Sequence, residues 1–202
     1  MPQSDKIAMI EEAVSLLLLE ANDKPPTVRE ISVRSGFGVG TIYDYFGSLN
    51  GLFTQLLLKK QQALLYDVKK MIDAHPPDIG GVELLDGIID KLFLQVNGRN
   101  PKMLRFILEI ALKSGKSPDD FNRAIDCLVI PMMDAQKRDR TGTLPVLDAM
   151  ELSLLLRCMQ STIRSPLFEM SQFFGTTDHI EKVKSIGRRL FHQQERQYKS
   201  KI

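Results

Sequence analysis

A short stretch of the chain gathers side chains that can bind a phosphate or the edge of a base: Thr41, Tyr43, Asp44 and Tyr45. Hydroxyl groups donate hydrogen bonds to phosphate oxygens, and a carboxylate can accept one from the amino group of cytosine in a major groove. Three apolar residues between them, Val39, Ile42 and Phe46, recur at helical spacing and are expected to face a core. The polar side chains then lie on the outer face of a short helix. Two ordinary interpretations stay open: Asp44 as a solvated charge, and the tyrosines as core residues.

A second short helix is predicted just before this one. Thr27 is a candidate N-cap, and Glu30 three residues later completes a capping box. Val28 and Ile31 give this helix an apolar side. The pair Gly36 and Gly38 ends it, because glycine accepts the backbone angles of a sharp turn between helices. Two helices joined by a tight glycine turn make a helix-turn-helix, whose second helix can lie in the major groove of DNA.

The segment from about residue 7 to residue 57 resembles the DNA-binding domain of the tetracycline-repressor (TetR-like) family of bacterial regulators. The resemblance rests on an apolar first helix (IAMIEEAVSLLLLEAN), then TVREI from Thr27, Gly36, GTIYDYF from Gly40, Ser48, and the apolar pair Leu52-Phe53. It implies an N-terminal three-helix DNA-binding domain, here residues 1–47. It also implies a C-terminal helical domain for ligand binding and dimerisation, here residues 48–202.

The resemblance also implies roles for single residues. The family contacts phosphates or bases at the positions of Thr27, Arg29, Thr41, Tyr43 and Tyr45. The predicted DNA-binding set adds three neighbours on the same helix-turn-helix, namely Gly38, Val39 and Asp44. The implied function is that of a dimeric transcriptional regulator, most often a repressor, that binds a double-stranded DNA operator and leaves it when a small molecule binds.

Some positions depart from the family pattern. The family usually has a lysine where this chain has Leu49, and a neutral or basic residue where it has Asp44. The first 51 residues hold four lysines and arginines against seven acidic residues. A protein surface with few cations releases few counterions when it binds DNA, so we expect its DNA affinity to depend only weakly on salt concentration. These features favour a second hypothesis, an all-α ligand-binding or protein-interaction dimer of the same fold with weak or lost DNA binding.

The rest of the chain shows helical periodicity and no strand pattern, which makes the fold all-α with about nine helices. Beyond the two short helices, the expected ones cover residues 5–21, 48–74, 82–97, 101–113, 117–138, 145–163 and 178–198. Ser48 is expected to cap the fourth helix, and Pro131 to kink the one over 117–138.

The helix over 145–163 is apolar on more than one face. A helix that is apolar all round must be buried on all sides. We therefore expect it to meet both an internal core and a partner subunit. The last two helices are predicted to form a four-helix bundle with those of a second copy, giving a homodimer. Gly187 would allow close helix approach.

An effector cavity is implied by the resemblance, and apolar residues of the C-terminal helices are its candidate lining. Flexible methionines suit an adaptable apolar pocket, although each residue alone is also typical of ordinary core. The ligand would be apolar or amphipathic. The candidates are Met103, Phe106, Ile107, Ile110, Met132, Met133, Met159 and Phe168.

The sequence gives little support for a catalytic, metal-binding or dinucleotide-binding site. Cys127 and Cys158 lie in apolar helical stretches and are expected to be small buried hydrophobic residues. The three histidines, His75, His179 and His192, are far apart and are expected to be solvated. The glycines from 36 to 40 follow a helix rather than a strand, which argues against a dinucleotide loop. No catalytic residue, metal site or cofactor is predicted, so an enzyme is not expected.

The composition, with 43% hydrophobic and 26% charged residues, is ordinary for a globular protein. No apolar stretch approaches the roughly 20 residues that a membrane-spanning helix needs. The N-terminal residues MPQSDK do not form a secretion signal, so a cytoplasmic location is expected.

Overall fold

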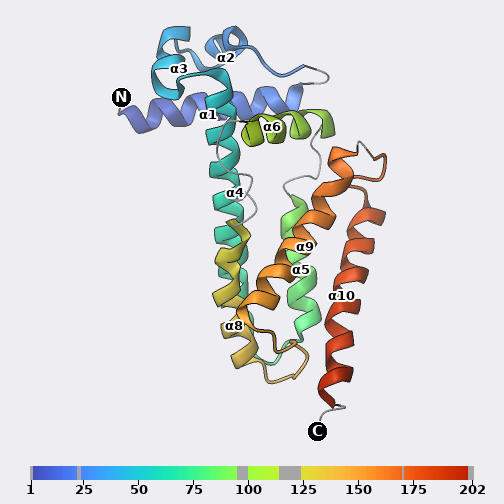
Figure 1. The fold of residues 1–202 in the computed structure, drawn as a ribbon. Helices are drawn as coiled ribbons and strands as arrows, with labels where there is room; N and C mark the ends of the chain where they lie inside the picture. The colour runs from blue at the N-terminus through green and yellow to red at the C-terminus, as the bar shows by residue number, and fades with distance from the viewer. Residues whose placement is uncertain (1, 22–23, 95–99, 114–123, 170, 200–202) are drawn as a thin grey trace. The chain divides into compact units, whose positions relative to one another are not determined.

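The computed structural model describes residues 2–21, 24–94, 100–113, 124–169 and 171–199, without the side chains at 112 and 190–199. Every regular element in these ranges is helical, as predicted (Figure 1). The elements are α1 (Gln3–Glu20), α2 (Val28–Ser35), α3 (Val39–Phe46), α4 (Leu49–Asp73), α5 (Gly81–Leu94), α6 (Pro101–Lys113), the 3₁₀ helix η1 (Ala124–Leu128), α8 (Val129–Arg138), α9 (Ala149–Phe168) and α10 (Thr177–Lys199).

The chain forms two compact units. The N-terminal unit comprises Met1–Gln61 and Gly98–Pro118, and the C-terminal unit comprises Gln62–Asn97 and Asp119–Ile202. Helix α4 contributes its first half to one unit and its second half to the other, and α6 belongs with the N-terminal helices. The predicted division at residue 47 concerns functional domains and stays a prediction.

The helix-turn-helix of the N-terminal unit forms as its sequence predicts. Thr27 caps α2, and the reciprocal bonds between Thr27 and Glu30 complete the capping box. Gly36 ends α2 with a left-handed backbone (φ 76°), and its N–H donates to the Ser32 carbonyl. One apolar cluster fixes α3 against its neighbours. Its buried members are Ile10, Val14, Ile31, Ile42, Phe46, Leu52, Phe53, Leu56 and Ile107, contributed by α1, α2, α3, α4 and α6.

The turn from α3 into α4 is unusually tight. Gly47 has a positive φ of 70° and donates its N–H to the Tyr43 carbonyl. Ser48 caps α4 as predicted, since its hydroxyl accepts from the Gly51 N–H at 2.9 Å. A Cβ placed on Gly51 would lie 2.3 Å from the backbone oxygen of Phe46, well inside van der Waals contact. The close packing of this turn therefore requires glycine at position 51.

We expect Gly51→Ala to lower the free energy of unfolding by about 1–3 kcal/mol, because the backbone of the turn must move to admit the methyl group. Chemical denaturation of the full chain measures this. Gly40→Ala is the matched control, because its Cβ meets nothing within 4 Å. Alanine is the better helix former, so this control should leave stability unchanged or raise it by up to about 1 kcal/mol. Equal losses in the two variants would contradict the steric explanation.

The C-terminal unit is built around α5 and α10, which pack side by side (Figure 1). Its core joins residues of α4, α5, η1, α8, α9 and α10. Gly187 of α10 does allow close approach, because a Cβ there would lie 3.1 Å from Leu85 and 3.6 Å from Ile89 of α5. The approach it permits is therefore to α5 within the same chain.

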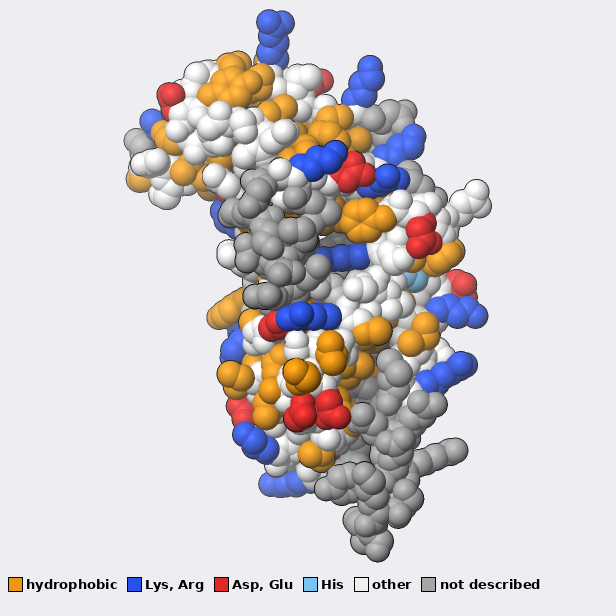
Figure 2. All heavy atoms as spheres, in the orientation of Figure 1, with side chains coloured by type: hydrophobic (Ala, Val, Ile, Leu, Met, Phe, Trp, Pro, Cys, Tyr) orange, Lys and Arg blue, Asp and Glu red, His pale blue; other side chains and the backbone are white. Residues whose placement is uncertain are grey.

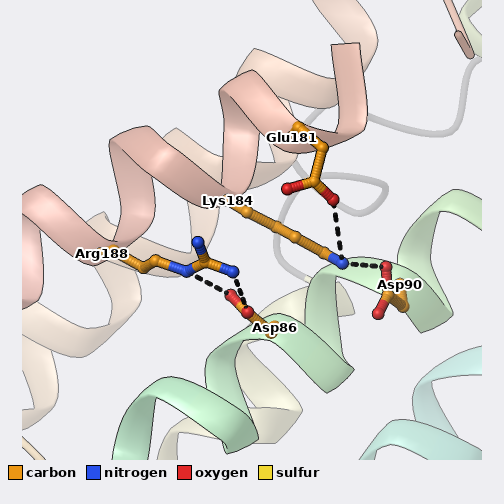
Figure 3. Close-up of polar contacts among 5 residues, drawn as sticks. All are labelled: Asp86, Asp90, Glu181, Lys184 and Arg188. Carbon is orange, nitrogen blue, oxygen red and sulfur yellow. Dashed lines mark hydrogen bonds and ion pairs between the residues drawn. The ribbon is translucent and has the colours of Figure 1, made fainter. Parts of the chain in front are cut away.

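Ion pairs also join α10 to α5 (Figure 3). Arg188 binds the Asp86 carboxylate with both Nε, at 3.1 Å, and a terminal nitrogen. Lys184 Nζ lies 2.7 Å from Asp90 Oδ1 and 3.5 Å from Glu181 Oε1. The hydrogen bond to Asp90 is the main cause that raises the pKa of Lys184. These pairs fix the register of α10 on α5 at the side of the apolar contact.

Several predicted helices have different bounds in the structure. The helix expected over 145–163 begins only at Ala149, because Asp148 caps it through a capping box with Glu151. It then continues through Pro166 to Phe168. Of the helix expected over 117–138, residues 117–123 lie outside the described residues, and residues 124–128 form η1 instead. Pro131, which was expected to kink that helix, lies instead in the first turn of α8, where its missing N–H costs little. Residues 95–97 of the helix expected over 82–97 also lie outside the description.

His179 is buried, with 3% of its surface exposed, so the prediction that it is solvated was wrong. Its ring packs edge-on against Phe93 and Phe173, with centroid distances of 4.9 and 5.4 Å. Pro166 cannot donate to the Thr162 carbonyl four residues earlier, and His179 Nε2 lies 3.4 Å from that oxygen. The Gly175 N–H donates to Nδ1 at 3.1 Å. Both ring nitrogens of a neutral imidazole thus have hydrogen-bond partners. The helical periodicity of the sequence does not reveal this buried role.

Burial lowers the pKa of His179 below its usual value of 6.5. The folded state holds the ring in its neutral form. The stabilisation of the fold by this neutral ring is fully present above pH 6.5, and it is lost as the pH falls from there through the lowered pKa. We therefore expect the free energy of unfolding to decrease between pH 7 and pH 5. In His179→Gln, whose amide can still donate and accept, this part of the pH dependence should disappear. Urea unfolding at each pH measures it, and an unchanged slope in the variant would contradict the assignment.

The thiols of Cys127 and Cys158 are both exposed, which corrects the prediction that they are buried. Cys158 lies on the outer side of α9, because the inner side is taken by Leu156, Met159 and Ile163. Partial burial, followed by the charge of Asp126, raises the pKa of the Cys127 thiol. Within the described residues, no helix is long and apolar enough to cross a membrane.

Candidate nucleic-acid interface

The outer face of α3 presents the polar residues that the sequence analysis selected. Ile42 and Phe46 are 0% and 5% exposed and hold the helix on its core. Tyr43 is 41% exposed, Asp44 is exposed, and Thr41 is half-buried beside them. The short helix is therefore fixed on one side and open on the other. This open side displays a phenol, a hydroxyl and a carboxylate.

Tyr45 and Val39 have a mixed position. Both are half-buried, and Tyr45 packs against the edge of the N-terminal core. Tyr45 therefore contributes to packing as well as to the surface, in line with the core interpretation that the sequence left open. Gly38 is exposed and caps α3 without any side-chain hydrogen bond. The first N–H groups of α3 are therefore free of a side-chain cap at the helix end that favours anions.

Thr27 is exposed at the start of α2, but its polar groups are engaged. Its hydroxyl donates to Glu30 Oε2 at 2.8 Å and accepts from the Glu30 N–H at 3.3 Å. Its backbone N–H donates to the same carboxylate at 2.6 Å. These bonds, the backbone one first, lower the pKa of Glu30, so the carboxylate stays charged. A phosphate at Thr27 would therefore lie close to a negative charge.

The excess of acidic residues in the first 51 positions is partly used inside the fold. Glu11 is 8% exposed and pairs with Lys59 of α4. Glu20 pairs with Arg34, and Glu30 belongs to the capping box. These three of the seven acids join separate parts of the unit or cap a helix, while Arg29 is exposed on α2 and Asp44 on α3. Of these three, only Glu11 is neutralised by a cation from outside the first 51 residues, because Glu30 stays charged and exposed and Glu20 uses one of the four counted cations.

The eight residues proposed to line a ligand cavity fall in both compact units. In the N-terminal unit, Met103 and Ile107 line a cavity, Ile110 packs on the core, and the Phe106 ring meets Phe53 edge-on with centroids 6.0 Å apart. The other four lie in the C-terminal unit. There Met132 and Met159 are buried in the core, Met133 packs against it, and Phe168 is 39% exposed. Their common role as a ligand site stays a proposal.

The other residues that line this cavity, mostly from α1 and α4, were not predicted from the sequence. One signal was available. Four consecutive leucines, residues 16–19, exceed the single apolar stripe that a core-facing helix needs. Leu16 and Leu19 are indeed 42% and 60% exposed. Among the described residues, no group of three or more histidine, cysteine or acidic side chains could hold a metal ion.

Fold and surface together define an all-helical protein whose first three helices form a helix-turn-helix unit. No protein-family model matches the sequence, and no curated protein matches it either. Solved structures do match the chain. A TetR-family transcriptional regulator from Mesorhizobium loti aligns over 95% of this chain and 96% of its own, with a TM-score of 0.67 and 13% identity. A TetR transcriptional regulator from Rhodococcus sp. RHA1 aligns over 94% and 96%, with a TM-score of 0.59 and 19% identity. The chain therefore has the fold of TetR-family regulators over almost its whole length.

Proposed function

We propose that this protein is a transcriptional regulator of the TetR type, a dimer that represses by binding operator DNA and is released by a small molecule. The observation that carries the proposal is the polar outer face of α3, fixed by Ile42 and Phe46 on a chain with the TetR fold. A regulator of this kind acts on chromosomal DNA, so the cytoplasmic location expected from the sequence is part of the proposal.

In this proposal α3 enters a major groove, with Tyr43 and Thr41 donating to phosphates or base edges. The uncapped N-terminus of α3 adds a favourable dipole for a phosphate. Arg29 contributes a cation from α2, and Thr27, Gly38, Val39, Asp44 and Tyr45 complete the contact surface. Asp44 accepts a hydrogen bond from a base or remains solvated. With few cations, binding depends on neutral donors and on shape more than on counterion release.

The proposed dimer uses α9 and α10. An apolar stripe runs along the outer side of α9 at a spacing of four residues, formed by Met150 (74% exposed), Leu154 (61%) and the exposed Cys158. Val146 and Ile130 are 74% and 70% exposed. Figure 2 shows hydrophobic side chains gathered on the surface over α8 and α9. An apolar surface of this kind marks an interaction site, and a second copy in a four-helix bundle would cover it.

Dimerisation sets the geometry of DNA reading. The two copies of α3 must meet half-sites about one helical turn apart, roughly 34–36 Å. An effector releases the operator by preferring a state of the dimer with a different spacing, and it shifts the population only by that preference. In the proposal this change passes along α4, which runs without a break from Leu49 to Asp73.

The test is an operator-binding assay with DNA from the protein's own promoter region, carried out on the dimer at low salt. Specific retention, lost on competition with the same fragment and kept with unrelated DNA, supports the proposal. Equally weak binding to every duplex supports instead the second candidate, a ligand-binding dimer without an operator. The exposed carboxylate of Asp44 on α3 is the observation that favours this alternative. Asp44→Asn should then strengthen binding to all duplexes alike.

A further inference from the structure

A narrow cavity opens within the N-terminal unit, between α1, α4 and α6. It encloses a small volume of about 60 Å³, and every described residue of its wall belongs to this one unit. The wall is mainly apolar, with Leu18 and Leu19 from α1, Phe53 and Leu57 from α4, and Leu104 from α6. An apolar lining of this kind suits the apolar body of a small ligand, which must displace some of the wall side chains to enter.

Three polar residues also line the cavity, and all three have interactions within the fold. Ser15 donates its hydroxyl proton to the Glu11 carbonyl at 2.8 Å. The Asn100 amide nitrogen donates to the Ala21 carbonyl at 3.1 Å, and its oxygen accepts from the Lys102 N–H at 2.9 Å. Among the described residues of the wall, Lys60 supplies the one charged group. An ammonium carries three N–H donors, so it can bind an acid while keeping a contact within the protein. A carboxylate is the complementary group.

The cavity shares its wall with the core that supports α3. Phe53, Leu56 and Ile107 line the cavity, and the same three side chains belong to the cluster that buries Ile42 and Phe46. Protein cores are close-packed, so a ligand that displaces these side chains must move their neighbours. Occupancy of the cavity is therefore coupled to the position of α3 inside a single compact unit.

We propose that this cavity binds a small amphipathic carboxylic acid, with its acid at Lys60 and its apolar body among the leucines, and that the bound acid shifts α3. The consequence for DNA rests on the function proposed above, whereas binding and the shift of α3 do not. The site differs from a ligand pocket in the C-terminal helices, because α1 forms part of its wall.

The first experiment measures binding to the full chain without DNA. Octanoate is the probe and 1-octanol its neutral counterpart, both followed by NMR titration. In Lys60→Met, which keeps the apolar stem, octanoate should bind about tenfold more weakly and octanol about equally well, as expected for a lost charged hydrogen bond. Lys70→Met, on the same helix outside the cavity, is the control and should change neither.

A second variant tests the location. Leu19 is 60% exposed at the cavity wall, so Leu19→Trp can fill the cavity without disturbing the core. It should weaken both probes at least about tenfold, a factor that corresponds to about 1.4 kcal/mol. Leu16→Trp, on the same helix and outside the wall, should leave binding unchanged. Failure of octanoate to bind, or binding that survives both Lys60→Met and Leu19→Trp, would overturn the proposal.

The second experiment follows α3 itself. The chain has no tryptophan, so Tyr43→Trp places a single indole on α3. Octanoate should shift its emission with the same midpoint as the NMR titration, and Lys60→Met in this background should move both midpoints together. Binding without any emission change would overturn the coupling. If octanoate binds and shifts the emission while the wild-type protein retains no promoter DNA, the proposed function fails and the ligand site stands.

Discussion

Replacing Tyr43 by alanine should lower operator affinity at least about 30-fold while the protein stays folded and dimeric. A single lost contact to phosphate or base costs about 1–3 kcal/mol, and a symmetric dimer loses two of them. The loss of stability should be small, because Tyr43 is 41% exposed and Ile42 and Phe46 carry the packing of α3. Electrophoretic mobility shift with the promoter fragment measures the affinity, and circular dichroism checks the fold.

Two further variants sharpen the interpretation of this result. Tyr66→Ala removes the same side chain from α4, where it is 62% exposed, and should leave DNA binding unchanged. Tyr43→Phe keeps the ring and removes only the hydroxyl, so it separates a hydrogen bond to DNA from ring contact. Retention of full operator affinity in Tyr43→Ala would contradict the placement of α3 in the groove.

Much of the N-terminal unit could be predicted because its signals are local. The capping box of Thr27 and Glu30 and the left-handed Gly36 depend on neighbours within a few residues. The inward side of α3 follows from a spacing of three and four residues. The predicted all-α fold and the likeness to TetR-type proteins agree with solved structures at only 13% and 19% identity. Local rules of helix formation thus persist where overall sequence similarity does not.

The errors of prediction share a physical cause, which is that burial depends on contacts between distant segments. His179 is polar and lies near a helix start, yet it is buried. Its ring packs against Phe93 and Phe173, and its Nε2 lies close to the carbonyl that Pro166 leaves free. Cys158 lies in an apolar stretch, but that stretch has more apolar residues than one core can bury, so one side of α9 stays exposed. The cavity of the N-terminal unit likewise combines residues from three helices that are far apart in the chain.

The exposed side of α9 leads to the second large effect. We expect Leu154→Glu to convert the dimer to a monomer, because the symmetric bundle would bury two new carboxylates on an apolar stripe. Burying an unpaired charge costs several kcal/mol, enough to separate subunits at micromolar concentration. Sedimentation velocity should show the mass fall from twice 22.9 kDa to 22.9 kDa.

The variant should remain folded, since Leu154 is 61% exposed in the single chain and the inner side of α9 is untouched. Leu94→Glu is the matched control, with the same substitution at a leucine that is 60% exposed on α5, and it should remain a dimer. The monomer should also lose most of its operator affinity, because one α3 reads only one half-site. A dimeric Leu154→Glu protein would place the subunit contact elsewhere on the molecule.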